Sequence, residues 1–166
     1  MKNLIAVFTL FICSFVFPQK KLADVSLLTL EGNKVSTESI TKNSVVVVAL
    51  WSTKCPPCKK ELNNINKIHE EWKMQTGVPF YAVSIDKKQD ASKVVDMAKK
   101  SNWSFSVLLD QEKKLRKALG VWTVPLTLVI KNNKIVYRQI GYSNGAEKQL
   151  FKAIKKHTTN KKYASL

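Results

Sequence analysis

Hydrophobic residues follow two different periodicities along this chain, which predicts an α/β protein. Continuous apolar runs at 45–50 and 80–85 are typical of strands that are buried on both faces of a sheet. Helical spacing of apolar residues predicts helices at 58–76, 91–100, 111–119 and 146–157. Shorter strands are predicted at 106–109, 126–130 and 135–140, the last two as a hairpin.

A second hairpin is predicted near the N-terminus. Weak alternation over 25–30 and a short run at 34–37 indicate two strands, joined by a turn at 31–33. The alternation of strands and helices, ending in a strand pair and a helix, predicts an α/β sandwich with a mixed sheet. The valine run at 45–50 is expected to be its central strand.

The N-terminal residues have the pattern of a secretory signal peptide. Lys2 gives a positive start, and the apolar run Leu4–Phe17 has about 14 residues, fewer than the roughly 20 that a spanning helix needs. We therefore predict a signal peptide at 1–19, a single domain at 20–160 and a tail at 161–166. An uncleaved membrane anchor is the alternative, because no small-x-small cleavage site is present.

An export signal implies a periplasmic or other extracytoplasmic space, where disulfides persist. Cys13 lies within the predicted signal peptide and is expected to leave with it. A lipoprotein signal needs a small residue before the cysteine, and Ile12 is too bulky, so we do not expect Cys13 to carry a lipid. Two cysteines then remain, Cys55 and Cys58. A pair only three positions apart closes too small a loop to restrain the unfolded chain much, so it indicates a redox site.

The chain is strongly basic, with 28 Lys and Arg against 12 Asp and Glu and a formal net charge of +16. Only Arg116 and Arg138 are arginines, and the lysines are spread along the chain. Nucleic-acid sites favour a clustered patch with arginine, so we expect no nucleic-acid partner. A solvated lysine surface favours acidic partners or the anionic face of a membrane.

The two remaining cysteines lie where the strand at 45–50 passes into the following helix. At a helix N-terminus a thiolate meets free backbone N–H groups and the positive end of the helix dipole, which lower the pKa of a cysteine. Cys55, the more N-terminal and more exposed of the two, is expected to attack a substrate disulfide. Cys58, one turn into the helix, is expected to resolve the mixed disulfide.

The residues around Cys55 indicate the direction of the reaction. Pro56 and Pro57 have no N–H group, which leaves the two following residues to donate to the Cys55 thiolate. Fewer donors stabilise the thiolate less, which favours a reductant or isomerase over a strong oxidant. Lys54 acts in the opposite sense, but salt screens an exposed charge. A dithiol oxidant stays the alternative.

Two segments resemble the TlpA/ResA-like branch of the thioredoxin-fold thiol-disulfide oxidoreductases. They are WSTKCPPCKKEL at 51–62 and VWTVPLT at 121–127, and the likeness extends over roughly 27–157. The resemblance implies a thioredoxin-like fold, in which helices flank a mixed central sheet, here with an N-terminal β-hairpin extension. It also implies that no cofactor is needed, since the cysteine pair itself carries two electrons.

The resemblance assigns roles to further residues. Pro125 matches a cis-proline that lies against the disulfide, and Val124 before it offers its backbone to an incoming substrate. Trp51 matches an aromatic residue beside the active site, which places it among the substrate-binding residues. The alternative for Trp51 is an ordinary core residue, because it directly follows the valine run. Glu61 matches a glutamate one helical turn beyond Cys58 that shuttles the proton of the resolving thiol. The alternative for Glu61 is an ordinary surface residue.

Two positions depart from the pattern of the family. Lys54 stands directly before Cys55, where the family usually has an aromatic residue, so the surface that faces a partner is altered. Ala49 stands where thioredoxins proper carry a buried aspartate, so any assisting acid must be Glu61. Trp122 is expected to flank the same face of the molecule.

A reductant in an oxidising space must be recharged, and the resemblance implies a membrane protein that brings electrons from the cytoplasm. The clients are expected to be disulfide-containing exported proteins, either apocytochrome c with its haem-site cysteines or misbridged proteins. We expect a monomer. The sequence chooses neither the client nor the reduction potential.

Three other functions compete with this one. A zinc site would need Cys55 and Cys58 with His69 and His157, but the histidines stand alone and not as a close couple. A peroxiredoxin would need a Pro-x-x-x-Thr/Ser-x-x-Cys pattern and a nearby arginine, and the residues before Cys55 do not fit that pattern. A non-catalytic binding module of thioredoxin shape would leave the cysteines idle, and the sequence alone does not exclude it.

Overall fold

The computed structural model describes residues 21–158 of the 166-residue chain. The predicted signal peptide at 1–19 and the predicted tail at 161–166 lie outside these residues. Within the described range, no helix is long and apolar enough to cross a membrane.

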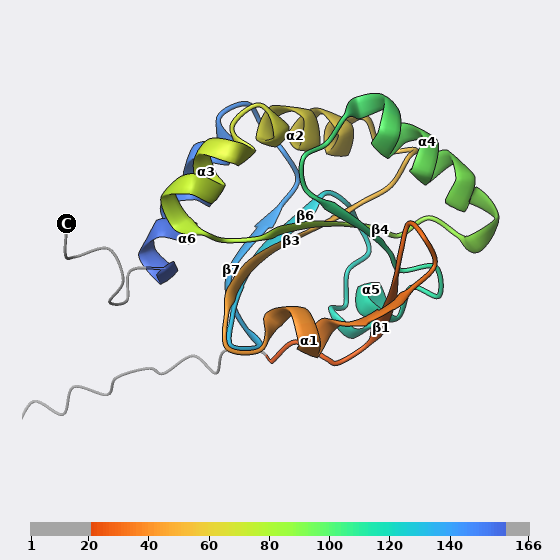
Figure 1. The fold of residues 1–166 in the computed structure, drawn as a ribbon, viewed down its shortest axis with the longest axis horizontal. Helices are drawn as coiled ribbons and strands as arrows, with labels where there is room; N and C mark the ends of the chain where they lie inside the picture. Colours follow the sequence, from red (N-terminus) through yellow and green to blue (C-terminus); the bar gives the residue numbers. More distant parts are fainter. Residues whose placement is uncertain (1–20, 159–166) are drawn as a thin grey trace, which may run out of the picture.

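In the described residues, one mixed sheet of seven strands forms the centre of the fold, in the order β2-β1-β5-β4-β3-β6-β7 (Figure 1). The strands are β1 Ser26–Thr29, β2 Lys34–Ser36, β3 Val45–Trp51, β4 Phe80–Ser84, β5 Ser106–Leu109, β6 Leu126–Lys131 and β7 Lys134–Ile140. β4 pairs in parallel with β3 and β5, whereas all other neighbours pair antiparallel. The mixed sheet and the N-terminal hairpin of β1 and β2 confirm the prediction.

The valine-rich strand β3 lies between β4 and β6 in the middle of the sheet. Its side chains alternate between the two faces, so Val47, Ala49 and Trp51 belong to one core and residues 46, 48 and 50 to the other. Each of these six side chains is at most 1% exposed. Full burial of an aliphatic side chain contributes about 1.5–3 kcal/mol, which explains why this run takes the central position.

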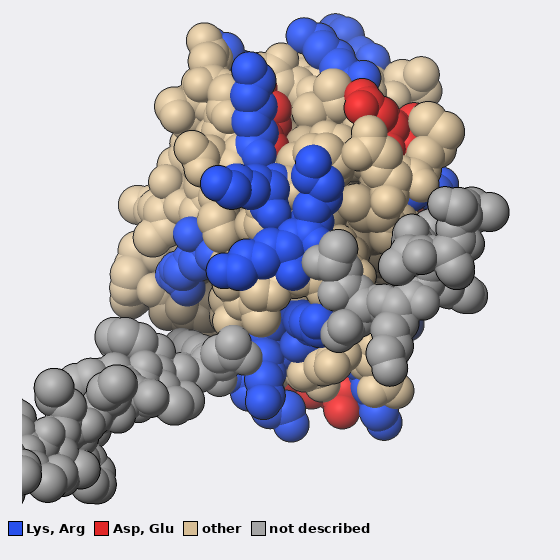
Figure 2. All heavy atoms as spheres, turned by 90° about the vertical axis from the view of Figure 1, so that its left-hand side faces the viewer, with Lys and Arg blue, Asp and Glu red and all other residues tan. Residues whose placement is uncertain are grey.

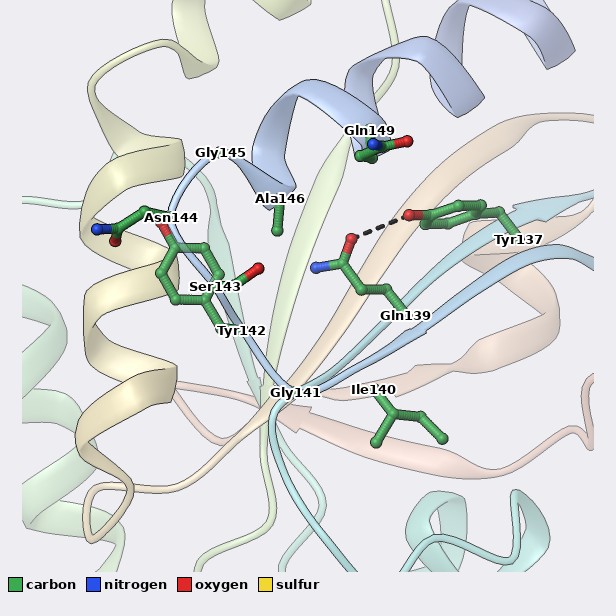
Figure 3. A pocket seen from close by; sticks show the side chains of 10 residues that line it. All are labelled: Tyr137, Gln139, Ile140, Gly141, Tyr142, Ser143, Asn144, Gly145, Ala146 and Gln149. Carbon is green, nitrogen blue, oxygen red and sulfur yellow. Dashed lines mark hydrogen bonds between the residues drawn. The ribbon is translucent and has the colours of Figure 1, made fainter.

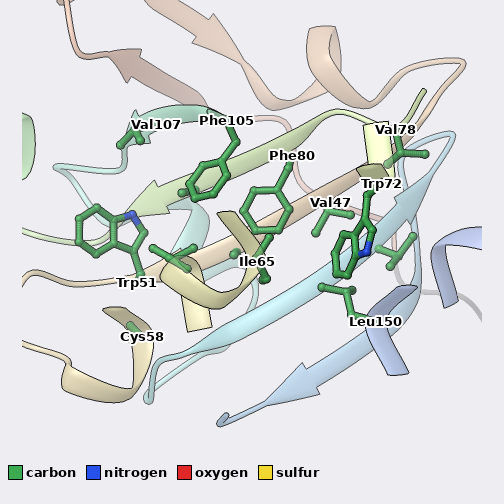
Figure 4. Close-up of a cluster of buried hydrophobic side chains, with 14 of the residues drawn as sticks. Val47, Trp51, Cys58, Ile65, Trp72, Val78, Phe80, Phe105, Val107 and Leu150 are labelled. Carbon is green, nitrogen blue, oxygen red and sulfur yellow. The ribbon is translucent and has the colours of Figure 1, made fainter. Parts of the chain in front are cut away.

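Helices cover both faces of the sheet (Figure 1). One face carries α2 Pro56–Asn66, α3 His69–Thr76, α4 Ala91–Ser101 and α6 Ala146–Thr158, and the other carries α1 Thr37–Thr41 and α5 Lys114–Ala118. A short 3-10 helix, Lys88–Asp90, leads into α4. The core beneath the four helices holds most of the aromatic side chains within residues 21–158 and includes Cys58 (Figure 4).

The single helix predicted over 58–76 is two helices, because the chain leaves helical geometry at Ile68. Ile68 has φ −122° and ψ 0°, and α3 starts after it in a new direction (Figure 1). The change of direction lets Trp72 stack on Phe151 of α6, with ring centroids 5.0 Å apart. A tertiary contact thus overrides a continuous helical pattern.

Two shorter helices also differ from the prediction. α5 begins later than the pattern at 111–119 predicts, because Lys113 has a left-handed φ of 56° through which a helix cannot continue. The sequence predicts a strand at 34–37 and no helix after it. In the structure the strand β2 ends at Ser36, and the short helix α1 follows directly. Ser36 caps α1, since its hydroxyl accepts a hydrogen bond from the backbone N–H of Ser39 at 3.2 Å.

Candidate active site

Cys55 and Cys58 form a disulfide at the N-terminus of α2. Cys55 is the N-cap residue, and its sulfur accepts a hydrogen bond from the backbone N–H of Cys58 at 3.2 Å. Pro56 and Pro57 occupy the first helical positions, where a missing N–H costs no intrahelical bond. The N–H of Lys59, which the sequence predicts as a second donor, donates to the Cys55 carbonyl instead. Within the described residues, the sulfur therefore has a single backbone donor.

The two cysteines differ in their access to solvent. Cys55 is 9% exposed and Cys58 is 0% exposed. A partner protein can therefore reach Cys55 but not Cys58. This asymmetry fits attack by Cys55 and resolution from the interior by Cys58.

Hydrogen bonds to Asp86, which follows β4, hold the loop before the disulfide in place. The Asp86 carboxylate accepts hydrogen bonds from the Ser52 hydroxyl at 2.8 Å and from the Thr53 backbone N–H at 2.8 Å. The hydroxyls of Thr53 and Ser84 donate to the same carboxylate. β3 and β4 run parallel, so their carboxyl ends meet at one edge of the sheet. Asp86 has no role in the sequence-based prediction, although an acid directly after a buried strand is a signal that could have found it.

The second segment of the site is the loop before β6. The Val124–Pro125 peptide bond is cis, which is the isomer that the resemblance implies. The carbonyl oxygen of Val124 lies 3.7 Å from the Cys55 sulfur. A disulfide sulfur carries no hydrogen, so this is a contact, and only the reduced thiol can donate a hydrogen bond there. The pairing of β6 with β3 holds this loop against the start of α2.

Glu61 lies one turn beyond Cys58 on α2 and is only 2% exposed. Its Oε1 accepts hydrogen bonds from the Thr127 hydroxyl at 2.9 Å and from the side-chain amide of Gln139 at 3.4 Å. Burial raises the pKa of Glu61 to about 7, because desolvation outweighs the hydrogen bond from Thr127. The alternative of an ordinary surface glutamate is therefore wrong.

The position of Ala49 shows where this acid lies. In the register of β3 and β6, Ala49 is opposite Thr127, the residue that binds the Glu61 carboxyl group. Glu61 thus reaches, from α2, the strand pair on which thioredoxins proper carry their buried aspartate. Ala49, which departs from the thioredoxin pattern, and the buried acid Glu61 therefore both lie next to Thr127.

Comparison with known proteins connects this geometry with a family. The AhpC/TSA family profile matches residues 18–139. The chain belongs to the AhpC/TSA family. A similar relative is the thiol-disulfide oxidoreductase ResA of Bacillus anthracis, which is 29% identical over 123 residues, or 74% of this chain and 69% of the relative.

Solved structures resemble this AhpC/TSA protein over most of its length. An uncharacterized thioredoxin-like protein of Porphyromonas gingivalis is 33% identical, with a TM-score of 0.74 and a match that covers 86% of this chain and 94% of its own. StoA of Bacillus subtilis is 25% identical, with a TM-score of 0.66 and coverage of 80% and 96%. The predicted thioredoxin-like fold and the ResA/TlpA-like relationship are confirmed.

Trp51 supports the AhpC/TSA site from the interior. Its side chain is 1% exposed and packs edge-to-face against Trp103, with ring centroids 5.0 Å apart. It lies among the buried side chains of the larger core (Figure 4). A docked protein cannot contact a side chain at this depth, so the predicted substrate-binding role of Trp51 does not fit its position.

The two histidines of the zinc alternative do not join Cys55 and Cys58 in the described residues. Among residues 21–158, no three side chains of His, Cys, Asp or Glu gather as metal ligands. His69 packs edge-on against Phe80 and Phe105, and its Nδ1 lies 2.7 Å from the Ser104 hydroxyl. In this AhpC/TSA protein, Cys55 is paired with a cysteine and not with a histidine.

A polar hollow of about 570 Å³ lies between β7 and the start of α6 (Figure 3). Its lining residues are all uncharged and include Tyr137 and Gln139. Gln139 accepts a hydrogen bond from the Tyr137 hydroxyl at 2.9 Å and donates one to Glu61. Gln139 therefore connects the buried carboxyl group with this open hollow. The sequence does not reveal the link, because Gln139 and Glu61 are 78 positions apart.

Proposed function

We propose that this protein is an exported thiol-disulfide oxidoreductase that mainly reduces disulfides in other exported proteins. The class of activity follows from the family and from relatives that carry the name thiol-disulfide oxidoreductase. The observation that carries the proposal is the disulfide itself. Its Cys55 sulfur faces the surface at a helix start beside the Val124 carbonyl group, with Cys58 buried behind it.

The reduced pair passes two electrons to a client in two exchanges. The Cys55 thiolate attacks one sulfur of the client disulfide, forms a mixed disulfide and releases the other client sulfur as a thiolate. The Cys58 thiolate then attacks the Cys55 sulfur, which closes the Cys55–Cys58 disulfide and releases the second client thiolate. The client gains two electrons and two protons, and the protein ends in the disulfide form.

Glu61 accepts the proton that Cys58 loses before the second exchange. It lies one helical turn from Cys58, and a carboxyl group with a pKa of about 7 can both take up and return a proton near neutral pH. Thr127 and Gln139 hold this carboxyl group in place. On the outer side of the pair, the backbone of Val124 beside Pro125 receives the client.

The direction of transfer rests on the weak stabilisation of the Cys55 thiolate. One backbone N–H reaches the sulfur, where proline-free helix starts offer more. A reductant of this kind works without a bound cofactor and takes its electrons from a membrane protein. Its clients are exported proteins such as apocytochrome c or misbridged proteins. A dithiol oxidant is the alternative direction.

The reduction potential of the pair tests the direction. It is measured by equilibrating the protein in glutathione or dithiothreitol buffers and trapping the free thiols. A value near or below that of thioredoxin, about −270 mV, supports a reductant. A value near that of DsbA, about −120 mV, makes the protein an oxidant.

A trapping experiment separates an enzyme from a binding module. Cys58→Ser removes the resolving thiol, so an enzyme accumulates mixed disulfides through Cys55 when it meets oxidised insulin. Cys55→Ser is the matched control and should trap nothing, because Cys58 is buried. A Cys58→Ser protein that forms no mixed disulfide is a binding module.

A further inference from the structure

Trp122 is 87% exposed, which is unusual for a tryptophan. It lies three residues before Pro125, and the Val124 carbonyl group between them contacts the Cys55 sulfur. Tryptophan supplies a large contact area to protein interfaces and is enriched among the residues that dominate binding. An exposed indole ring in the loop whose Val124 carbonyl group contacts the reactive sulfur therefore indicates a place where another molecule binds.

The backbone under Trp122 is held firmly, so the exposure does not come from a loose loop. The Arg116 guanidinium donates hydrogen bonds to the carbonyl oxygens of Val121 at 3.0 Å and of Trp122 at 2.9 Å. The N–H of Val121 donates in turn to the Arg116 carbonyl at 3.1 Å. These bonds from α5 present the indole ring on a fixed backbone, which lowers the entropic cost of binding.

Two adjoining hollows extend from Trp122 to the loop before the disulfide. The first, of about 320 Å³, is enclosed largely by the indole ring and the aliphatic stems of side chains on and before α5. The second, of about 250 Å³, is lined in part by Lys54, the residue directly before Cys55. Lys113 and Arg116 line both hollows, so the two form one path along the surface.

This path carries an excess of positive charge. Its cationic side chains are Lys54, Lys87, Lys113, Arg116 and Lys117. The two carboxylates in its lining are already engaged, because Asp86 binds the active-site loop and Asp90 pairs with Lys93 at 2.8 Å. An acidic group that enters the path meets these cations, and an apolar group finds the wall beside Trp122.

We propose that Trp122 and the two hollows form a docking surface for an extended acidic segment of the client, next to its reactive cysteine. An apolar client side chain lies against Trp122, and the Asp or Glu residues that flank it pair with Lys113 and Lys117. This inference rests on the proposed function and specifies the kind of client that the disulfide serves.

The test uses the oxidised wild-type protein and a short fluorescent peptide without cysteine, in which one leucine is flanked by Asp and Glu. Because this peptide has no thiol, fluorescence anisotropy reports docking alone. We expect the acidic peptide to bind about tenfold more tightly than the same peptide with Lys in place of each acid.

Protein variants locate the binding. Trp122→Ala should weaken it about tenfold. Lys113→Asn with Lys117→Gln should weaken it about fivefold at low salt and little at high salt; asparagine tolerates the left-handed φ of 56° at position 113. Lys99→Gln with Lys100→Gln on α4 removes the same charge and should leave the affinity unchanged. This control matters because Lys and Arg also gather elsewhere, as on the face with α3 and α6 (Figure 2).

Two results would overturn the docking surface. Equal weakening by the Lys113/Lys117 and Lys99/Lys100 double substitutions would show a general attraction to a basic protein. A dimer that sedimentation detects and that Trp122→Ala dissociates would show that a second copy of the chain covers the tryptophan.

A separate measurement distinguishes failure of this inference from failure of the proposed function. The dithiol form should reduce a small uncharged disulfide whatever stands at position 122. If it does not, the proposed function fails, while the cysteine-free peptide still decides the docking surface. If it does, and Trp122→Ala binds the acidic peptide as well as the wild type, this inference alone fails.

Discussion

Glu61 is a buried acid whose charge changes near neutral pH. Burial raises its pKa from 4.5 to about 7, so folding favours the protonated form. Its contribution to stability is fully present below pH 4.5 and is lost as the pH rises through 7. At about 1.4 kcal/mol per pKa unit, this contribution amounts to about 3 kcal/mol.

Glu61→Gln is expected to remove this pH dependence of stability. Glutamine has nearly the same shape, can still accept a hydrogen bond from Thr127, and does not titrate. Urea unfolding of the oxidised protein from about pH 4 to 8 measures the effect, because cysteines in a disulfide do not titrate. If the free energy of unfolding falls equally with pH in both proteins, Glu61 is not the titrating group.

Asp86 carries the hydrogen bonds that fix the loop before the disulfide. Asp86→Ala should lower the free energy of unfolding by about 2–3 kcal/mol, because the backbone N–H of Thr53 and three hydroxyls lose a charged acceptor. Asp96→Ala, at an exposed site on α4, removes the same charge and should change stability by less than about 0.5 kcal/mol. Urea unfolding compares the two variants, and equal effects would exclude the role given to Asp86.

Among the elements, the start of α2 controls the chemistry of Cys55. Pro57→Ala restores a backbone N–H at the second helical position, from which a donor can reach an N-cap side chain. The added donor stabilises the thiolate, so the reduction potential should become less negative by about 30 mV, which corresponds to about 1.4 kcal/mol. Pro79→Ala, in the loop before β4, is the control and should leave the potential unchanged. An unchanged potential in Pro57→Ala would refute the argument from donors.

The long strands and helices could be predicted because their patterns are local. The observed bounds of β3 to β7, α4 and α6 lie within one residue of those predicted. The break between α2 and α3 could not be predicted, because its cause is the contact of Trp72 with Phe151. Asn66 at the end of α2 is likewise tied to distant Ser104, whose N–H donates to its side chain at 2.8 Å.

At the scale of the whole molecule, the net charge of +16 acts on approaching partners. The reduced protein should attack an acidic peptide disulfide about tenfold more slowly when salt rises from about 50 to 500 mM. Its rate with a small uncharged disulfide should change little. Stopped-flow kinetics measures both rates, and an equal loss with the two substrates would show that salt acts on the chemistry and not on the encounter.

By itself, the sequence determined the main elements and the reactive pair. A continuous run of apolar residues is most stable in a central strand, where both faces of the sheet are covered. A C-x-x-C spacing puts two sulfurs on one helical turn. Only the tertiary structure decided that Asp86, Thr127 and Gln139 serve the site and that Trp51 does not face a client. These outcomes depend on which strand ends meet and which side chains reach the core, and such contacts join residues far apart in the chain.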